Sequence, residues 1–201
     1  MPLERLRLLD CLVSDDAFDA VYPPEIRGLS ERHWTPVDVA ARAANLLLGA
    51  GATRILDVGS GAGKFCVVGA LSTDAEFVGV ERRQHLVSIA RHTATRLGAT
   101  RATFVHADVS TFSFERFDGV YLYNPFTEQI CPGLQPIDHT IEFTCDAYHR
   151  FIELTVSKLR AMSPPAAIAT FHGFGGDVPS DFFLELVEPA ATDRLELWVK
   201  R

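Results

Sequence analysis

The sequence predicts an α/β protein: a mostly parallel, seven-stranded, doubly wound sheet that ends in an antiparallel hairpin and follows an N-terminal helical extension. From residue 54 onward, short apolar segments alternate with amphipathic ones, as strands and crossover helices do in a parallel sheet. Near the end of the chain this alternation stops, because the last two apolar segments are joined by too few residues for a crossover. We expect residues 1–201 to form one domain, with residues 1–53 as the extension and residues 54–201 as the core.

Residues 1–53 are predicted to contain two helices. Apolar residues recur at helical spacing from Leu3 to Val13, which indicates a short amphipathic helix. Pro23-Pro24 interrupts regular helix, so we expect a connecting segment from there to Trp34. The run Thr35–Asp38 has the pattern of a helix start, with its first residue as the cap, and Gly49 should end that helix.

The core is predicted from apolar runs that are bounded by turn residues. Five of these runs should be parallel strands: Arg54–Val58, Glu76–Val80, Ala102–Ala107, Phe117–Tyr123 and Ala166–Phe171. Amphipathic helices are expected at Arg83–Leu97 and at Thr140–Met162. Phe182–Val187 and Leu195–Val199 flank the short segment Glu188–Arg194, so they should pair as an antiparallel hairpin.

The formal net charge of −7 limits the substrates that the chain is expected to bind. Proteins that grip nucleic acid usually present a basic face that displaces counterions from the phosphates. The charge balance therefore favours a small-molecule amine or a protein as the substrate and argues against nucleic acid. The oligomeric state leaves no trace in the sequence.

The cysteines and the N-terminal residues indicate the compartment. The four cysteines, Cys11, Cys66, Cys131 and Cys145, form neither a C-x-x-C pair nor the spacing of a zinc site. No group of His, Asp and Glu has metal-ligand spacing either, so we expect no metal. The charged N-terminal residues are unlike a signal peptide, and no apolar run approaches the length of a membrane span. We therefore expect a cytoplasmic protein with reduced thiols and no membrane partner.

The segment Ile55–Phe65, with the sequence ILDVGSGAGKF, combines a strand, a glycine-rich turn and a helix start. Gly59, Gly61 and Gly63 allow a tight turn in which a ligand can approach the backbone, and the following helix N-terminus offers free N–H groups. Glu81 ends the next predicted strand, where an acid can accept hydrogen bonds from both hydroxyls of a ribose. The alternative is a glycine-rich turn that binds nothing. The three glycines, together with Asp57 two residues before the first of them and with Glu81, disfavour this alternative.

The run D-V-G-S-G-A-G-K-F resembles motif I of the class I, Rossmann-like S-adenosylmethionine-dependent methyltransferases, and V-G-V-E resembles the motif that follows it. Ala107-Asp108-Val109 is similar to their third cofactor motif, in which an acid meets the adenine amino group. The resemblance covers Thr35 to Arg201 and includes the terminal hairpin. It implies a methyltransferase with S-adenosyl-L-methionine as its cofactor.

The same resemblance assigns the residues that would hold the cofactor. They are Asp57, Gly59, Ser60, Gly61, Gly63, Glu81, Asp108, Val109 and Thr35. In the family, the acid at the position of Asp57 helps to hold the methionine part. The segment His33–Pro36, which includes Thr35, could fold over that part of the cofactor, or it could be a plain helix cap.

The predicted fourth strand ends in Asn124-Pro125-Phe126, which should face the methyl group of the cofactor because ligands of open α/β sheets lie beyond the carboxyl ends of the strands. The triplet resembles the [DN]-P-P-[FYW] motif of methyltransferases that act on amino nitrogens. It has only one proline, with Phe126 at the second proline's place and Thr127 at the aromatic's. Its single-proline form is also similar to lysine methyltransferases of the telomeric-silencing type. Both likenesses imply that Asn124 orients an acceptor nitrogen and that Phe126 packs against it. The alternative is a turn after a buried strand.

A few other residues are weaker candidates. His106 and His172 follow predicted strands and could act as bases, although partly buried structural histidines would give the same pattern. The loop Thr127–His139 is long enough to be a lid. Lys64 is predicted to lie on a helix surface, because the chain lacks the Walker spacing of a phosphate-binding lysine.

Two other functions are consistent with parts of the pattern. A nicotinamide-dependent oxidoreductase would use the same glycines and Glu81, but its usual spacing is G-x-G-x-x-G, whereas this chain has G-x-G-x-G and a predicted hairpin. A cofactor-binding module without catalysis is the non-enzymatic alternative, and the incomplete asparagine-proline motif is consistent with it.

Overall fold

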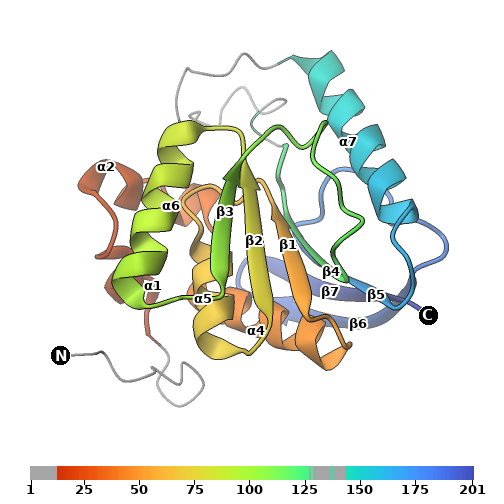
Figure 1. The fold of residues 1–201 in the computed structure, drawn as a ribbon, viewed down its shortest axis with the longest axis horizontal. Coiled ribbons are helices and arrows are strands. Elements are labelled where there is room, and N and C mark those ends of the chain that lie inside the picture. Colours follow the sequence, from red (N-terminus) through yellow and green to blue (C-terminus); the bar gives the residue numbers. More distant parts are fainter. Residues whose placement is uncertain (1–12, 127, 129–136, 138–143) are drawn as a thin grey trace.

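The computed structural model describes residues 13–126, 128, 137 and 144–201, which form a seven-stranded sheet with helices on both faces (Figure 1). The strands are β1 (Arg54–Val58), β2 (Glu76–Glu81), β3 (Ala102–His106), β4 (Gly119–Tyr123), β5 (Ala166–Phe171), β6 (Phe183–Ala190) and β7 (Asp193–Lys200). Their order across the sheet is β3-β2-β1-β4-β5-β7-β6. The pairs from β3 to β5 are parallel, and β7 pairs antiparallel with β5 and with β6. The predicted fold class is therefore confirmed.

Helices cover both faces of this sheet. They are α1 (Asp15–Asp19), α2 (Pro24–Arg27), α3 (Ser30–His33), α4 (Val37–Gly49), α5 (Lys64–Ser72), α6 (Gln84–Leu97) and α7 (Cys145–Arg160). One apolar core lies between the sheet and α4, α5 and α6, and a second lies between the sheet and α7. Within the described ranges, no helix combines the length and the apolar character that crossing a membrane requires.

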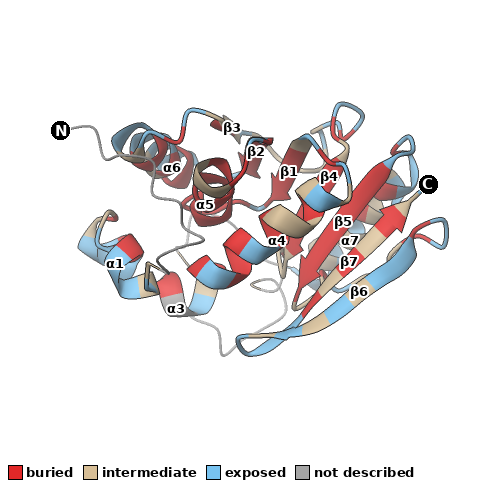
Figure 2. Cartoon of the chain, turned by 90° about the horizontal axis from the view of Figure 1, so that it is seen from below, coloured by how far each residue is buried: buried red, intermediate tan, exposed pale blue. Residues whose placement is uncertain are grey.

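The strands at the centre of the sheet are buried because each one serves both cores. Along β1, Ile55 belongs to the core under α5, whereas Leu56 and Val58 belong to the core under α7. Successive side chains of a strand point to opposite faces, so a strand between two helical layers is apolar on both sides. Figure 2 shows the contrast with β6, whose residues are mostly exposed at the edge of the sheet.

The terminal hairpin is longer and its turn shorter than the sequence predicted. The segment Glu188–Arg194 was expected to be the turn, but β6 and β7 continue to pair through it and leave only Ala191-Thr192 between them. Ala191 has a φ of 42°, in the left-handed region that a tight two-residue turn requires. The prediction ended each strand where its apolar run ends, whereas the pairing of Glu188–Ala190 with Asp193–Leu195 extends the ladder beyond those runs.

Two short helices occupy the segment from Pro24 to His33 that was expected to be a connection. The prolines begin a helix instead of preventing one, because Pro24 is the first residue of α2, where its missing N–H costs no hydrogen bond. The helix predicted between Leu3 and Val13 lies outside the described residues, except for Val13. The start of α7 also differs: it begins at Cys145 with Thr144 as its cap, and residues 140–143 are outside the described part.

Thr35 does not cap α4, contrary to the prediction from its sequence pattern. The helix begins at Val37, whose N–H donates to Asp15 Oδ1 over 3.0 Å. The Thr35 hydroxyl instead forms a hydrogen bond of 2.9 Å with the Tyr121 hydroxyl, in the interior. Because the Thr35 side chain is bound to Tyr121 of β4, Asp15 of α1 accepts the first N–H of α4 in its place.

Lys64 is buried, which corrects the prediction that it lies on a helix surface. It is 3% exposed, at the first position of α5. Its ammonium group pairs with Asp15, lies 2.9 Å from Asp19 Oδ1 and donates to Ser30 Oγ over 3.1 Å. These partners belong to α1 and α3, so the N-terminal helices pack over the start of α5 through one buried cation.

We expect Lys64→Ala to lower the free energy of unfolding by about 3–5 kcal/mol, because losing one partner of a buried ion pair leaves the other charge, Asp19, uncompensated. Urea unfolding followed by circular dichroism would measure the loss. Arg42→Ala is the control: it breaks an exposed pair of 2.6 Å with Glu188 and should cost about 1 kcal/mol or less. Similar losses in both variants would contradict a buried role for Lys64.

Candidate functional site

One cleft opens beyond the carboxyl ends of β1, β2 and β4, where the strand order reverses, and ligands of open α/β sheets bind at such a point. It consists of three cavities, and Gly59 lines all of them. The first cavity is lined by Val58, Val80, Asp108, Val109, Phe126 and Phe151, among others. The second includes Arg32, Trp34, Tyr123 and Asn124. The third includes Trp34, Thr35, Asp57, Ser60 and Tyr121.

The glycine-rich loop between β1 and α5 forms the centre of the cleft. Gly59, Gly61 and Gly63 have φ values of 75°, 53° and 83°, in the left-handed region that glycine adopts without strain. A Cβ atom on Gly59 would lie 3.2 Å from Pro125 Cβ, and one on Gly61 would overlap the ring of Trp34. The loop is therefore confined between the turn after β4 and the segment before α4, and only glycine fits.

Glu81 ends β2 beside this loop, as predicted. It is 5% exposed; its Oε2 accepts from the Gly61 N–H over 3.1 Å and its Oε1 from the Arg83 N–H over 2.8 Å. Burial raises the pKa of Glu81, and the two N–H donors and the Arg83 charge act against this rise. A carboxylate offers about four acceptor sites, so two remain for the paired hydroxyls of a ribose. These two free acceptor sites fit the predicted cofactor.

Asp57 lies in the third cavity at the end of β1 and is 5% exposed. Burial raises the pKa of its carboxyl from an ordinary value of 3.8 to about 7, although the Cys66 thiol, which donates to Asp57 Oδ2 over 3.4 Å, acts in the opposite direction. The nearby charge of Glu81 adds to the rise. A cation in this cavity would favour the ionised form of Asp57.

At one side of the first cavity, Asp108 lies beside apolar residues, which include Val80, Val109, Phe126 and Phe151. Asp108 Oδ1 accepts from the Ser110 N–H over 2.8 Å, and Arg82 Nε lies 3.8 Å from Asp108 Oδ2. Partial burial acts to raise the pKa of Asp108. Its hydrogen bonds with Ser110 and the nearby charges of Arg82 and Arg150 outweigh this effect and lower the pKa. The rings of Phe126 and Phe151 stack with centroids 5.6 Å apart. Apolar residues next to the Asp108 carboxylate suit a flat heteroaromatic ring that carries an amino group.

The Asn124-Pro125-Phe126 turn does not place all three residues in the same cavity. Asn124 has a left-handed φ of 44°, and its N–H donates to the Gly173 carbonyl over 3.0 Å. Asn124 lines the second cavity, Phe126 lines the first, and Pro125 lines both. The turn therefore separates the polar amide from the phenyl ring, which the sequence pattern had grouped at one site.

The remaining predicted cofactor residues, Thr35 and Ser60, lie with Asp57 in the third cavity. Trp34 borders both this cavity and the second one. Its indole N–H is buried and has no acceptor among the residues that the structure describes. The structure places all predicted cofactor residues in the glycine loop or around it.

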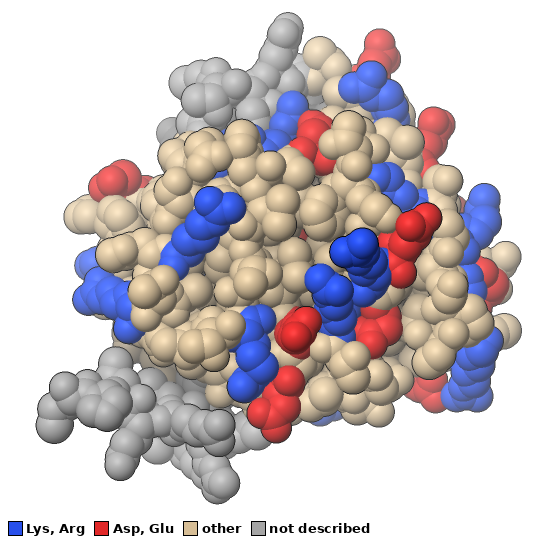
Figure 3. All heavy atoms as spheres, in the orientation of Figure 1, with Lys and Arg blue, Asp and Glu red and all other residues tan. Residues whose placement is uncertain are grey.

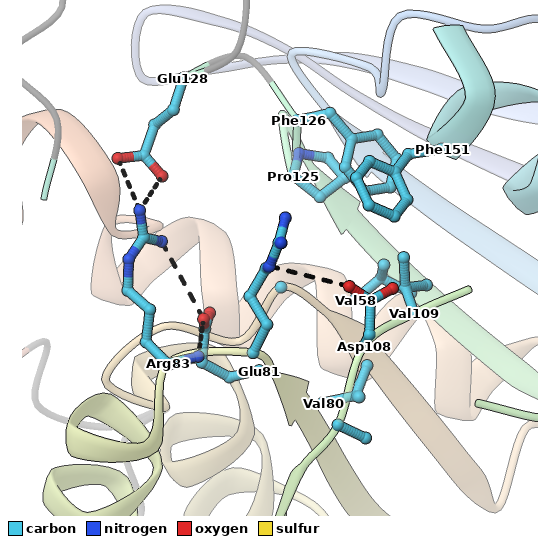
Figure 4. Close-up of a pocket in the computed structure, with 13 residues that line it drawn as sticks. Val58, Val80, Glu81, Arg83, Asp108, Val109, Pro125, Phe126, Glu128 and Phe151 are labelled. Carbon is cyan, nitrogen blue, oxygen red and sulfur yellow. Dashed lines mark hydrogen bonds and ion pairs between the residues drawn. The ribbon is translucent and has the colours of Figure 1, made fainter. Parts of the chain in front are cut away.

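Sequence reasoning did not single out several residues of the cleft, among them Arg83 and Phe151, and it included Glu128 only as part of the possible lid Thr127–His139. Arg83 and Glu128 form an ion pair with Nη2–Oε2 at 3.0 Å, and Phe151 reaches the first cavity from α7 (Figure 4). Arg83 lies two positions after the motif acid Glu81, which could have marked it. Phe151 falls on the apolar face of an amphipathic helix, so nothing in the sequence separates it from other core residues.

The two histidines considered as bases do not line any of the three cavities. His106 Nε2 lies 3.0 Å from the Arg82 carbonyl oxygen. His172 is held at both ring nitrogens, by Thr192 Oγ1 and by Asp193 Oδ2, each at 3.0 Å. No group of three or more His, Cys, Asp or Glu side chains in the described ranges could hold a metal. The predicted lid, Thr127–His139, lies outside the described residues except for positions 128 and 137.

Comparison with known proteins points to one family. The profile of a family described as "Methyltransferase domain" matches residues 50–157, which contain β1 to β4, the glycine loop, Glu81 and Asn124. No curated protein matches the chain in sequence.

Two solved structures illustrate the likeness in fold. An RNA methyltransferase from Salinibacter ruber, in complex with S-adenosyl-L-homocysteine, is 20% identical with a TM-score of 0.56, over 82% of this chain and 92% of that one. The magnesium protoporphyrin IX methyltransferase from Synechocystis PCC 6803, with bound S-adenosylmethionine, is 13% identical with a TM-score of 0.59, over 88% of this chain and 82% of that one. At these identities the likeness concerns the fold.

The raised pKa of Asp57 predicts that stability depends on pH. Folding favours the neutral carboxyl, so its contribution is present below about pH 4 and is lost as the pH rises through about 7. Relative to Asp57→Asn, the wild type should lose a few kcal/mol of unfolding free energy between about pH 4 and pH 8, at about 1.4 kcal/mol for each pKa unit. Denaturant unfolding at several pH values measures both proteins, and parallel curves would show that Asp57 is not perturbed.

Proposed function

Since this chain belongs to the methyltransferase domain family, and is thus an S-adenosylmethionine-dependent methyltransferase, we propose that it methylates an amino nitrogen of a small molecule or a protein side chain. The observation that carries the proposal is the position of Asn124. It directly follows β4 in a left-handed conformation and lines the second cavity with Trp34 and Tyr123, next to Gly59 of the glycine loop.

The residues of the cleft are proposed to hold S-adenosyl-L-methionine along its length. Asp108 and Val109 would bind the adenine in the first cavity, and Glu81 would accept hydrogen bonds from the ribose hydroxyls. Asp57, Ser60 and Thr35 would surround the methionine part in the third cavity. The cofactor supplies a methyl group activated by a positively charged sulfur.

The protein's own contribution would be to orient the acceptor. The Asn124 side-chain oxygen can accept an N–H of the amine, which fixes the direction of the nitrogen lone pair, and such orientation supplies much of the catalysis in a displacement. The aromatic rings of Trp34 and Tyr123 line the same cavity and favour a nitrogen that gains positive charge. Phe126 lines the first cavity, so in this proposal it packs beside the cofactor.

The charge distribution supports a small molecule or a protein as the substrate. The net charge is −7, and Figure 3 shows basic and acidic side chains interspersed over the described part of one face. A nucleic acid would be held by a continuous basic surface. A cytoplasmic location is also proposed, because Cys66 and Cys145, the two cysteines in the described ranges, are free thiols.

Calorimetric titration tests the cofactor assignment. S-adenosyl-L-methionine and S-adenosyl-L-homocysteine should bind, and NAD should not. Glu81→Ala should weaken binding by about 1–3 kcal/mol, because the ribose hydroxyls lose their acceptor. Glu76→Ala is the matched control, since Glu76 lies exposed at the opposite end of the same strand. Wild-type affinity in Glu81→Ala, or binding of NAD alone, would contradict the assignment.

Asn124→Ala should lower the turnover rate by on the order of a hundredfold, which is the typical effect of losing one well-placed polar contact to the transition state. Cofactor affinity should change much less, because Glu81 and Asp108 remain. A methyl-transfer screen over small amines and cell extract must first identify an acceptor. Asn45→Ala, in α4, is the control and should keep full activity.

A full turnover rate in Asn124→Ala would show that the asparagine only shapes the turn after β4. If the wild type binds the cofactor yet methylates no compound in a broad screen, the chain is better described as a cofactor-binding module.

A further inference from the structure

The first and second cavities are adjacent and share five lining residues: Gly59, Glu81, Arg83, Pro125 and Glu128. Asp108 lines only the first cavity, and Asn124 lines the second but not the first. A ligand that reaches from Asp108 to Asn124 must therefore pass these shared residues, which include Glu81.

Two of the shared lining residues, Arg83 and Glu128, form an ion pair. Arg83 Nη2 lies 3.0 Å from Glu128 Oε2, and Arg83 Nη1 lies 4.0 Å from Glu81 Oε1. Figure 4 shows the Arg83 guanidinium between the two carboxylates. The side chains of Arg83 and Glu128 are only 5% and 17% exposed, so water screens their attraction little. Separating them would leave a charge in a poorly solvated place.

The two partners come from different parts of the chain, and each is fixed on its own side. Arg83 directly precedes α6, and its N–H donates to Glu81. Glu128 follows the turn after β4, and its Oε1 also accepts from the Ile137 N–H over 2.8 Å. The ion pair thus links the end of β2 to the segment beyond β4 across the cleft.

We propose that the Arg83–Glu128 ion pair is a clasp over the ribose part of the cofactor, which must open whenever the cofactor enters or leaves. The proposal rests on the cofactor lying in this cleft, as the proposed function states. The neighbouring pair of Arg82 and Asp108 does not have this role: it is longer, at 3.8 Å, its side chains are 38% and 33% exposed, and both residues line only the first cavity.

The clasp predicts a distinctive kinetic effect of Glu128→Gln. The amide keeps the size of the side chain, but a neutral hydrogen bond is roughly half as strong as a charge-assisted one, so the pair opens more often. Stopped-flow binding of S-adenosyl-L-homocysteine to the full chain should then show association and dissociation rate constants that both rise by about tenfold, with a Kd within about threefold of the wild type.

Glu188→Gln is the matched control, because it removes the same charge from an arginine pair between α4 and β6 and should leave both rate constants unchanged. Faster dissociation alone would show that Glu128 contacts the ligand directly, and unchanged rate constants would show a purely structural pair; either result overturns the clasp while the cofactor assignment stands. A wild type that fails to bind S-adenosyl-L-homocysteine would overturn the proposed function itself. If Glu128→Gln does not fold, Glu128→Asp should show the same joint acceleration, because the shorter acid cannot close the pair fully.

Discussion

The parallel pairing of β1 with both β2 and β4 is the constraint on which the site depends. The strand order reverses at β1. The glycine loop that follows β1 therefore lies between the ends of β2 and β4. Trp34 before α4 approaches the loop so closely that Gly61 leaves no room for a Cβ atom, and Pro125 after β4 would lie in tight contact with a Cβ atom on Gly59. The same reversal that builds the sheet thus shapes the loop and opens the cleft beside it.

The cleft concentrates acids in a poorly solvated place, and the structure balances them with groups from elsewhere in the chain. Glu81 receives two backbone N–H donors and lies near Arg83, which in turn pairs with Glu128. Asp57 has only a thiol as a hydrogen-bond donor among the described residues, and its pKa is raised accordingly. A positively charged ligand would relieve this imbalance at Asp57. The pattern of compensation therefore agrees with a cationic cofactor at one end of the cleft.

Local patterns in the sequence determined the order of strands and helices, the sheet's parallel body and the cofactor motif. Ala166–Phe171 was predicted to its exact bounds as β5, because a short apolar run between prolines and glycines has few other structures available. Glu81 and the three glycines were located for a similar reason. The glycines belong to one turn, and Glu81 ends the strand that follows it, so their positions depend on residues that are close in the chain. The antiparallel hairpin followed from the shortness of its connection alone.

Only the tertiary structure decided where several side chains of the site point and what they contact. Lys64 is buried because Asp15 and Ser30, 49 and 34 positions earlier, fold over it. Phe126 turns away from Asn124 toward Phe151 of a distant helix, and Glu128 reaches Arg83 across 45 positions. Burial and charge pairing between remote segments arise when helices and loops pack on the finished sheet. Sequence periodicity records which face of an element is apolar, but it does not record which partner that face will meet.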